Sequence, residues 1–231
     1  MNRLSFWNRI SRILEEHNLL RHPFYQAWRD GTLTIADLRE YACEYYHHVA
    51  FFSVYLDTFA GRLPDGELKR RVLENLADEV GSSPGHPRAH NLLWMDFAIG
   101  VGAVPRHVFV RKPLPEVMAL IQTFLSLAKS GTTSEVLAAF FVYESQVPAI
   151  AQEKATSLRT KYGLDATACR YFTLHATADV AHAAVWREEL DRELEAEGGN
   201  FEAGLASAGR AAEDLWRALD GIHLQYRLRS R

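Results

Sequence analysis

Hydrophobic positions recur along this chain every three to four residues, which is the period of an α-helix. The clearest example is the segment 34–62, which is long enough for about eight helical turns. Its apolar stripe consists of Leu38, Tyr41, Tyr45, His48 and Phe52. Thr34 stands where a hydroxyl would cap the first turn of this helix. Alternating runs that would predict strands are missing from the sequence, so the pattern predicts an all-α protein.

Clusters of glycine, proline and small polar residues separate further helical segments. We expect these segments at 2–18, 23–30, 65–80, from His86 or His90 to 100, and at 113–130, 134–162, 165–197 and 202–227. Pro148 is expected to kink the segment 134–162 without ending it, because the apolar pattern continues. No internal repeat or low-complexity linker divides the chain. We therefore predict a single domain over residues 1–231, a bundle of about seven helices.

Composition narrows the class of protein. The chain has 231 residues, of which 48% are hydrophobic, and a net charge of −3 without any block of like charge. This gives no basic surface for nucleic acid or an anionic membrane. The only two cysteines, Cys43 and Cys169, suit a reducing compartment. With no secretory leader and no apolar stretch of about 20 residues, we expect a cytoplasmic protein without nucleic-acid or membrane partners.

The first candidate chemistry comes from a histidine-rich segment, HATADVAH. His175, Asp179 and His182 stand at offsets that place all three side chains on one stripe of a helix. Dinuclear metal sites in helical bundles use a carboxylate and a histidine three residues apart in this way. An amphipathic helix whose polar residues merely share a face is the alternative, and this segment alone does not decide between the two interpretations.

Other segments offer carboxylates that would complete a metal site. Glu144 lies in the apolar run AFFVYESQVP, where an unpaired buried charge would cost several kcal/mol. It should therefore meet a cation or be exposed. Glu79 closes the segment NLADEVG before a glycine turn and is followed by His86 and His90. Glu79 on its own would also fit a solvated helix end.

Taken together, these segments offer three carboxylates and three imidazoles. The set is Glu79, one of His86 and His90, Glu144, His175, Asp179 and His182. Nitrogen and oxygen donors in this number suit two divalent ions of iron or manganese, whereas structural zinc prefers a closed site with four ligands. The net positive charge would be balanced by an oxygen species or a substrate. Open positions on redox metals imply oxygen chemistry.

Six ordered blocks between Phe6 and about Leu190 resemble the CADD-like family (Chlamydia protein associating with death domains), which is related to the TenA/PqqC superfamily. The blocks are HNLLRHPFYQAW (17–28), LREYACEYYHHV (38–49), NLADE (75–79), HNLLWMDF (90–97), YESQVPAIAQEK (143–154) and YFTLHATADVAH (171–182). Members of this family are heme-oxygenase-like dimetal oxidases that act as 4-aminobenzoate synthases. The resemblance therefore implies a heme-oxygenase-like helical fold and a dinuclear site of Fe/Fe or Fe/Mn.

The resemblance implies the same ligand set as the residues themselves. For the histidine after Glu79 we choose His90, because it keeps the helix frame of the apolar residues that follow it. His86, in a loop rich in glycine and proline, is the reserve. The family's usual Glu-Glu pair is Glu79-Val80 here, so the resemblance leaves the second carboxylate of that pair unmatched.

The resemblance also implies an unusual source of the product. Family members are thought to excise one of their own tyrosines as the ring and to take the amino nitrogen from a lysine, using O₂ and an external reductant. By motif, these residues are Tyr25 and Lys154, while Tyr45, Tyr143 and Tyr171 would relay oxidising equivalents. A homodimer is expected on the same ground.

Four alternatives remain open. The metals could act on an external amino acid or amine, as in other heme-oxygenase-like dimetal oxidases. A thiaminase-type relative would use Cys43 as a nucleophile without metal, although no partner base is evident beside it. A non-catalytic interaction protein would need an exposed apolar patch. Finally, Tyr25 could be a simple packing residue, and Lys154 could lie on a solvated helix face.

Overall fold

The computed structural model describes residues 1–196 and 200–229, with side chains as far as residue 225. Within these ranges it contains eleven α-helices, one short 3₁₀ helix and no strand. Their bounds are α1 Arg3–Glu16, η1 Leu19–Arg21, α2 Pro23–Asp30, α3 Ile35–Arg62, α4 Glu67–Glu79, α5 His90–Gly100, α6 Pro105–Val110, α7 Pro115–Ser130, α8 Thr133–Glu144, α9 Val147–Thr160, α10 Ala166–Glu195 and α11 Phe201–Arg229. The all-α prediction is confirmed.

The predicted number of about seven helices is wrong, because each of the nine expected helical segments forms a helix and two further helices are added. The segment 134–162 is two helices, since α8 ends at Glu144 and α9 begins at Val147. Pro148 lies in the first turn of α9, where its missing N–H leaves no hydrogen bond unmade, so it starts a helix instead of kinking one. The short helix α6 adds one more. Residue 197, at the end of the expected segment 165–197, lies outside the described residues.

Capping side chains fix where the long helices begin. Thr34 caps α3, and the Asp37 side chain bonds back to the Thr34 backbone, which completes a capping box. Asp165 caps α10 in a similar way through the Ala168 N–H. Because every later residue of a helix follows in phase, these starts decide which side chains of α3 and α10 face the interior.

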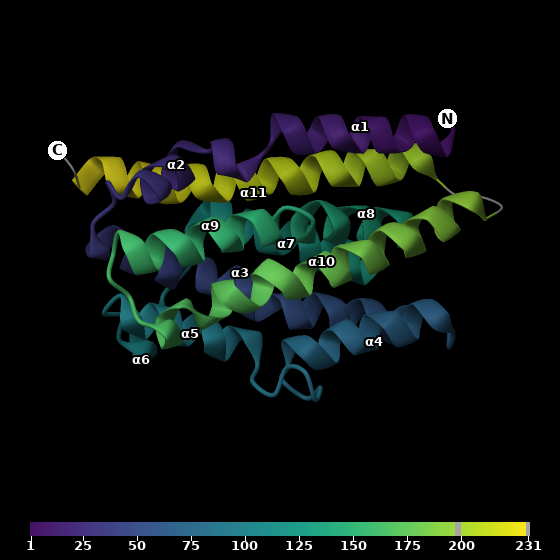
Figure 1. Ribbon diagram of the computed structural model, residues 1–231. Helices are drawn as coiled ribbons and strands as arrows, with labels where there is room; N and C mark the ends of the chain where they lie inside the picture. Colours follow the sequence, from purple (N-terminus) through teal and green to yellow (C-terminus); the bar gives the residue numbers. More distant parts are fainter. Residues whose placement is uncertain (197–199, 230–231) are drawn as a thin grey trace.

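Helix α10 crosses the near side of the bundle, between α9 and α4 in the view of Figure 1. It packs against α8 and α9 on one side and against α5 and α4 on the other. Helix α11 lies along α1, α7 and α8, while α3 packs against α4, α5 and α7. The carboxylates and histidines singled out from the sequence stand on α4, α5, α8 and α10, so the bundle gathers these four helices around its interior. Among the described helices, none combines the length and hydropathy needed to cross a membrane.

The interior is aromatic but also contains charged side chains. Trp28, Trp94 and Trp186 are almost fully buried. Glu144 and Lys154 are only 1% and 3% exposed. Charged residues are rarely buried to this degree unless they are paired or neutralised, so each of them needs a physical explanation.

Gly81, in the turn after α4, is a position where only glycine fits. Its φ is +73°, and a Cβ there would lie 2.4 Å from the backbone nitrogen of Ala89. We expect Gly81→Ala to lower the free energy of unfolding in urea by at least about 2 kcal/mol. At Gly85, in the same loop, a Cβ would meet nothing within 4 Å, so Gly85→Ala should change stability little. Equal stability of the two variants would contradict this prediction.

Candidate metal centre

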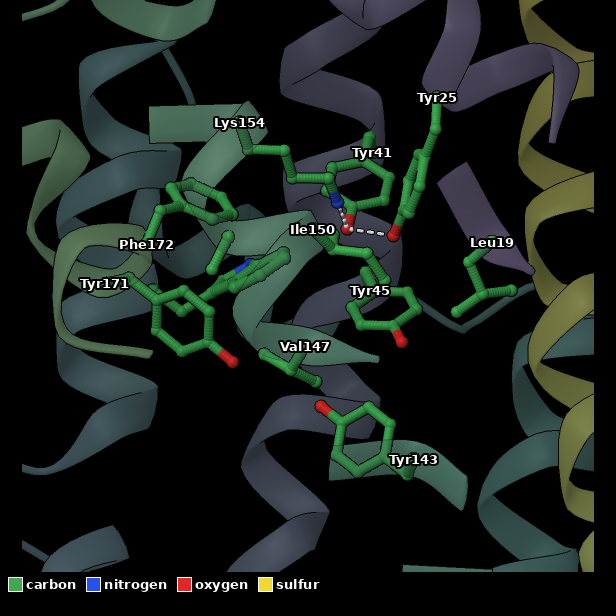
Figure 2. Close-up of a pocket in the computed structure, with 12 residues that line it drawn as sticks. Leu19, Tyr25, Tyr41, Tyr45, Tyr143, Val147, Ile150, Lys154, Tyr171 and Phe172 are labelled. Atoms are coloured by element: carbon green, nitrogen blue, oxygen red, sulfur yellow. Dashed lines mark hydrogen bonds between the residues drawn. The ribbon is translucent and has the colours of Figure 1, made fainter. Parts of the chain in front are cut away.

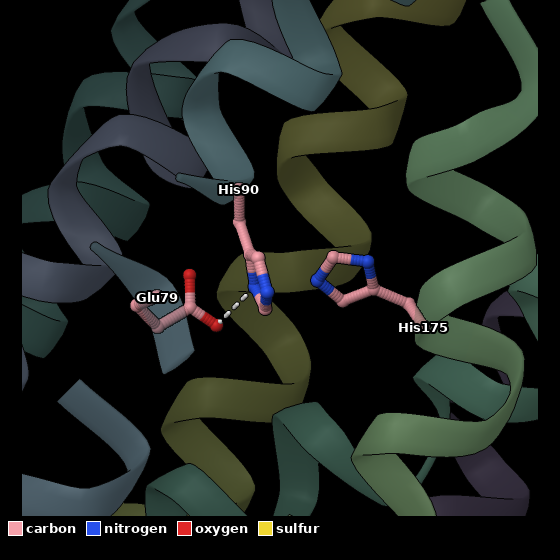
Figure 3. A group of neighbouring side chains, drawn as sticks. All are labelled: Glu79, His90 and His175. Atoms are coloured by element: carbon pink, nitrogen blue, oxygen red, sulfur yellow. Dashed lines mark hydrogen bonds and ion pairs between the residues drawn. The ribbon is translucent and has the colours of Figure 1, made fainter. Parts of the chain in front are cut away.

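One group of possible metal ligands joins three helices. Glu79 is the last residue of α4, His90 the first of α5, and His175 lies on α10; all three are buried. Their ligand atoms lie within 4.8 Å of one another. His90 stands between the other two side chains (Figure 3), with its Nδ1 2.9 Å from Glu79 Oε1 and its ring centroid 4.5 Å from that of His175. We call these residues the first triad.

A second triad lies further along α10. Asp179 and His182 occupy successive turns of α10, and Glu144 reaches them from the end of α8. Their ligand atoms also lie within 4.8 Å of one another, with His182 Nδ1 3.4 Å from Asp179 Oδ1. The indole N–H of Trp186 donates to Glu144, which orients this carboxylate. The two triads contain the six residues that the sequence singled out with His90 as the chosen histidine.

The histidine ring nitrogens have the arrangement that metal-binding histidines use. His175 donates its Nδ1–H to the Tyr171 carbonyl at 2.7 Å, and His182 donates its Nε2–H to Asp78 at 3.1 Å. The opposite nitrogen of each ring is then left with a lone pair. Within the described part of the chain, His90 Nε2 and His182 Nδ1 are buried without a hydrogen-bond partner. These orphaned acceptors, next to three carboxylates, fit a pair of cations.

The electrostatics of the triads also favour bound positive charge. Burial raises the pKa of Glu144 well above its usual range, although the His182 charge opposes this. Burial disfavours the charged form of His182, but the negative charges of the neighbouring Asp179 and Glu144 carboxylates raise its pKa to about 10. Cations would therefore stabilise the three buried carboxylates, and a set of oxygen and nitrogen donors suits iron or manganese.

His86 is placed outside both triads. Its Nδ1 lies 3.4 Å from Asp78 Oδ1, in the loop between α4 and α5. Asp78 itself is a residue that sequence reasoning missed, although the block NLADE contains it. One hundred degrees separate it from Glu79 on the helix, and only the packing of α4 against α10 brings it to His182. Val80, where the family's second glutamate is expected, is 48% exposed, and Asp78 supplies a carboxylate instead.

A small cavity of about 30 Å³ (Figure 2) adjoins the first triad, because Tyr171, which lines it, stacks on His175. The residues that line it are Leu19, Tyr25, Tyr41, Tyr45, Trp94, Tyr143, Val147, Ile150, Ala151, Lys154, Tyr171 and Phe172. Lys154 Nζ lies 2.6 Å from the Tyr41 hydroxyl and 3.6 Å from the ring centroid of Tyr25. The hydroxyls of Tyr25 and Tyr41 are 3.0 Å apart. The structure thus brings together the predicted tyrosine and lysine.

Burial sets the protonation of this pair. Lys154 is not on a solvated face, and burial lowers its pKa well below the usual value. The amine is thereby favoured in its neutral form, in which the nitrogen keeps a lone pair. Burial raises the pKa of Tyr25, so this phenol keeps its proton. Tyr41 forms hydrogen bonds with both groups. Like that of Asp78, its role was missed from the sequence, which placed Tyr41 only in the apolar stripe of its helix.

Three further tyrosines lie between the triads and the Tyr25–Lys154 pair. The Tyr171 ring stacks on His175 of the first triad, with centroids 3.9 Å apart and an interplanar angle of 26°. Tyr143 directly precedes Glu144. Tyr45 stacks on Tyr41 at 5.4 Å. Figure 2 shows the hydroxyls of Tyr45, Tyr143 and Tyr171 directed into the same space.

The two cysteines take no part in this arrangement. Cys43 and Cys169 are free and buried, and neither lines the cavity. Burial raises the pKa of both thiols, which lowers the fraction of reactive thiolate. The thiaminase-type alternative, with Cys43 as the nucleophile, therefore has no support in the geometry.

Comparison with known proteins agrees with this donor set. Residues 39–216 match the model of a family described as iron-containing redox enzymes. The chain belongs to this family. Membership makes the protein an oxidoreductase, and the two triads fit the dinuclear metal site expected of it.

The similarity to relatives in this family extends over most of the chain. A protein of Nitrosomonas europaea called 4-aminobenzoate synthase is 33% identical over 96% of this chain and 92% of its own. One from Chlamydia pneumoniae with the same name is 31% identical over 92% of each chain. A Shewanella denitrificans domain of unknown function with a heme-oxygenase-like fold superposes with a TM-score of 0.81 at 19% identity, covering 100% of this chain and 95% of that one. The fold of this family member is therefore heme-oxygenase-like.

Proposed function

We propose that this protein is an oxygen-dependent 4-aminobenzoate synthase that consumes its own Tyr25 as the ring and its own Lys154 as the nitrogen donor. The observation that carries the proposal is the buried amine of Lys154, which lies 3.6 Å from the centre of the Tyr25 ring and whose pKa is lowered by burial. The relatives called 4-aminobenzoate synthase support the product.

The chemistry of the product matches these two side chains. In 4-aminobenzoate, the amino nitrogen and the carboxyl carbon stand at opposite ends of one ring. A tyrosine ring carries its hydroxyl and its Cβ at the same two positions. The product therefore requires oxidation of Tyr25 Cβ, release from the backbone, and replacement of the hydroxyl by nitrogen. Two ions, Fe/Fe or Fe/Mn, held by the six triad residues would supply the oxidising power from O₂ and an external reductant.

The surrounding side chains hold the reactants in place. The Tyr41 hydroxyl contacts both the Tyr25 hydroxyl and the Lys154 amine, so it fixes their relative position. We propose that Tyr171, Tyr143 and Tyr45 carry oxidising equivalents from the triads towards Tyr25. The stacking of Tyr171 on His175 and of Tyr45 on Tyr41 supports this role.

The size of the cavity argues against an external substrate. A volume of about 30 Å³ holds only two or three water molecules, since about 10–15 Å³ is needed for one. An amino acid or amine would not fit without displacing residues of the wall. The ring and the amine already present in the wall are, in contrast, within reaction distance.

Mass spectrometry tests this function directly. Protein loaded anaerobically with iron or manganese and then given reductant and air is expected to release 4-aminobenzoate, with a matching mass loss at Tyr25. Tyr25→Phe should bind two metal ions and release no product. Two bound ions with an intact Tyr25 and no product would contradict self-consumption, and mass loss at Tyr41 would assign the ring to the neighbouring tyrosine.

A further inference from the structure

His86 lies beside both triads without belonging to either. Its ring centroid is 5.4 Å from that of His90, in the first triad, and 6.5 Å from that of His182, in the second. Its Nδ1 is 3.4 Å from Asp78 Oδ1, while Asp78 Oδ2 is 3.1 Å from His182 Nε2. Asp78 therefore has one oxygen directed to His86 and the other to a triad histidine. We call His86 and Asp78 the rim pair.

The loop that carries His86 is tightly built. Ser82 N–H donates to the Ala77 carbonyl at 2.8 Å, and His86 N–H donates to the Ser83 carbonyl at 3.1 Å. The Ser83 hydroxyl donates to Asp78, which ties the loop to the end of α4. Together with the left-handed backbone at Gly81, these bonds fix the backbone of the loop that carries His86.

The rim pair has the geometry of two ligands of one ion. Donor atoms that each lie about 2.1 Å from a divalent cation are about 3.0–3.4 Å from one another, depending on the coordination angle. The separation of 3.4 Å between His86 Nδ1 and Asp78 Oδ1 fits this range. In the described part of the chain, His86 Nδ1 is also a buried atom without a hydrogen-bond partner.

The rim pair stands between solvent and the triads. The side chains of His86 and Asp78 are 17% and 24% exposed, whereas those of His90 and Glu79 are 0% and 7% exposed. A hydrated cation bound at the rim pair would first exchange some of its water ligands for these two side chains. It would lose its remaining water ligands when it reaches the triads. This ordering lowers the barrier to dehydration, because water ligands are replaced in steps.

We propose that the rim pair is an entry site at which a divalent cation binds before it passes to the triads. The proposal rests on the dinuclear centre of the proposed function. It assigns to His86 a role in the kinetics of metal uptake and none in the final coordination.

An entry residue and a ligand differ in what they change. Removing an entry residue slows binding and release by the same factor, so the dissociation constant stays unchanged. Removing a ligand weakens binding, which raises the dissociation constant, or it lowers the number of ions bound. Measuring both rates and the equilibrium therefore separates the two roles.

Manganese(II) alone, added under anaerobic conditions, provides the measurement. Uptake is followed by loss of the electron paramagnetic resonance signal of free Mn²⁺, and release by transfer to an excess of chelator. We expect His86→Gln to slow both by about tenfold, with two ions bound and an unchanged dissociation constant. His86→Asp, which restores a donor, should recover most of the rate. His107→Gln, at an exposed histidine on α6, is the matched control.

Each other outcome contradicts the entry site. Unchanged rates in His86→Gln, with a circular dichroism melting curve like that of the unaltered protein, would show that ions enter elsewhere. A higher dissociation constant, or a single bound ion instead of two, would show that His86 is a ligand. If the unaltered protein binds no Mn²⁺ or Fe²⁺, the proposed metal centre fails and the entry site fails with it; two ions bound with unchanged rates defeat the entry site alone.

Discussion

Replacing Lys154 by methionine is expected to abolish release of 4-aminobenzoate while leaving two metal ions bound. Methionine has nearly the length of lysine and suits a buried apolar site, so the fold should persist. The reason for the loss is chemical, because the only amine close to the Tyr25 ring among the described residues that line the cavity is removed. The measurement is product yield per protein after reaction with reductant and air.

Isotope labelling tests the role of Lys154 in the unaltered protein, so the result does not depend on whether a variant folds. Protein grown with ¹⁵N-lysine as the only labelled residue should release product heavier by the mass of one neutron. Lys129→Met, at an exposed position on α7, is the control and should react like the unaltered protein. Unlabelled product, or product from Lys154→Met, would exclude Lys154 as the nitrogen donor.

The second large effect concerns acid stability and His48. This side chain is fully buried among Tyr45, Tyr55, Phe124 and Tyr143. Neither ring nitrogen has a hydrogen-bond partner in the described part of the chain. Burial lowers the pKa of His48 to about 3, so the folded protein keeps this imidazole neutral.

The sign of the effect follows from proton binding. An unfolded histidine takes up its proton near pH 6.5, whereas His48 in the folded protein does so near pH 3. Between these values the unfolded state binds more protons, so stability falls as the pH falls, by about 1.4 kcal/mol per pH unit from this residue. We therefore expect His48→Phe to become more stable than the unaltered protein below pH 6.

Urea unfolding of both proteins between pH 7 and pH 4.5 measures this difference. At pH 7 the two free energies should be similar, and by pH 4.5 the variant should lead by about 2–3 kcal/mol. All other acid-sensitive groups are shared, so the difference isolates His48. Parallel pH profiles for the two proteins would contradict the prediction, because they would show that the pKa of His48 is the same in the folded and unfolded states.

Periodicity predicted the helical class and the positions of the long helices. Thr34 and Asp165 stand at the beginnings of α3 and α10 because capping is a local interaction that a short stretch of sequence determines. The break at Ser145 and Gln146 was not predictable in this way. The apolar pattern runs on through Pro148, so periodicity does not show that Pro148 begins a second helix, which packs with α8 against α10.

The site shows the same division between local and long-range information. His175, Asp179 and His182 share a helix face, and this spacing alone pointed to them. The helix frame of the residues that follow it favours His90 over His86, and the structure places His90 beside Glu79 at the start of α5. The roles of Tyr41 and Asp78 arise from contacts more than 100 residues away, with Lys154 and His182. No spacing rule within one helix detects such pairs.

The packing of Tyr25 has a consequence for the fate of the spent protein. Its ring lies under the short helix α2 against Phe24, Tyr41 and the Lys154 amine, and it is 3% exposed. If the ring leaves as product, the bundle keeps a hole of that size, and losses of a buried aromatic ring cost about 3–5 kcal/mol. A domain with only about 5–15 kcal/mol of stability would then unfold far more often. The reaction would thereby mark each used molecule for proteolysis, so that cells clear spent copies in preference to unreacted ones.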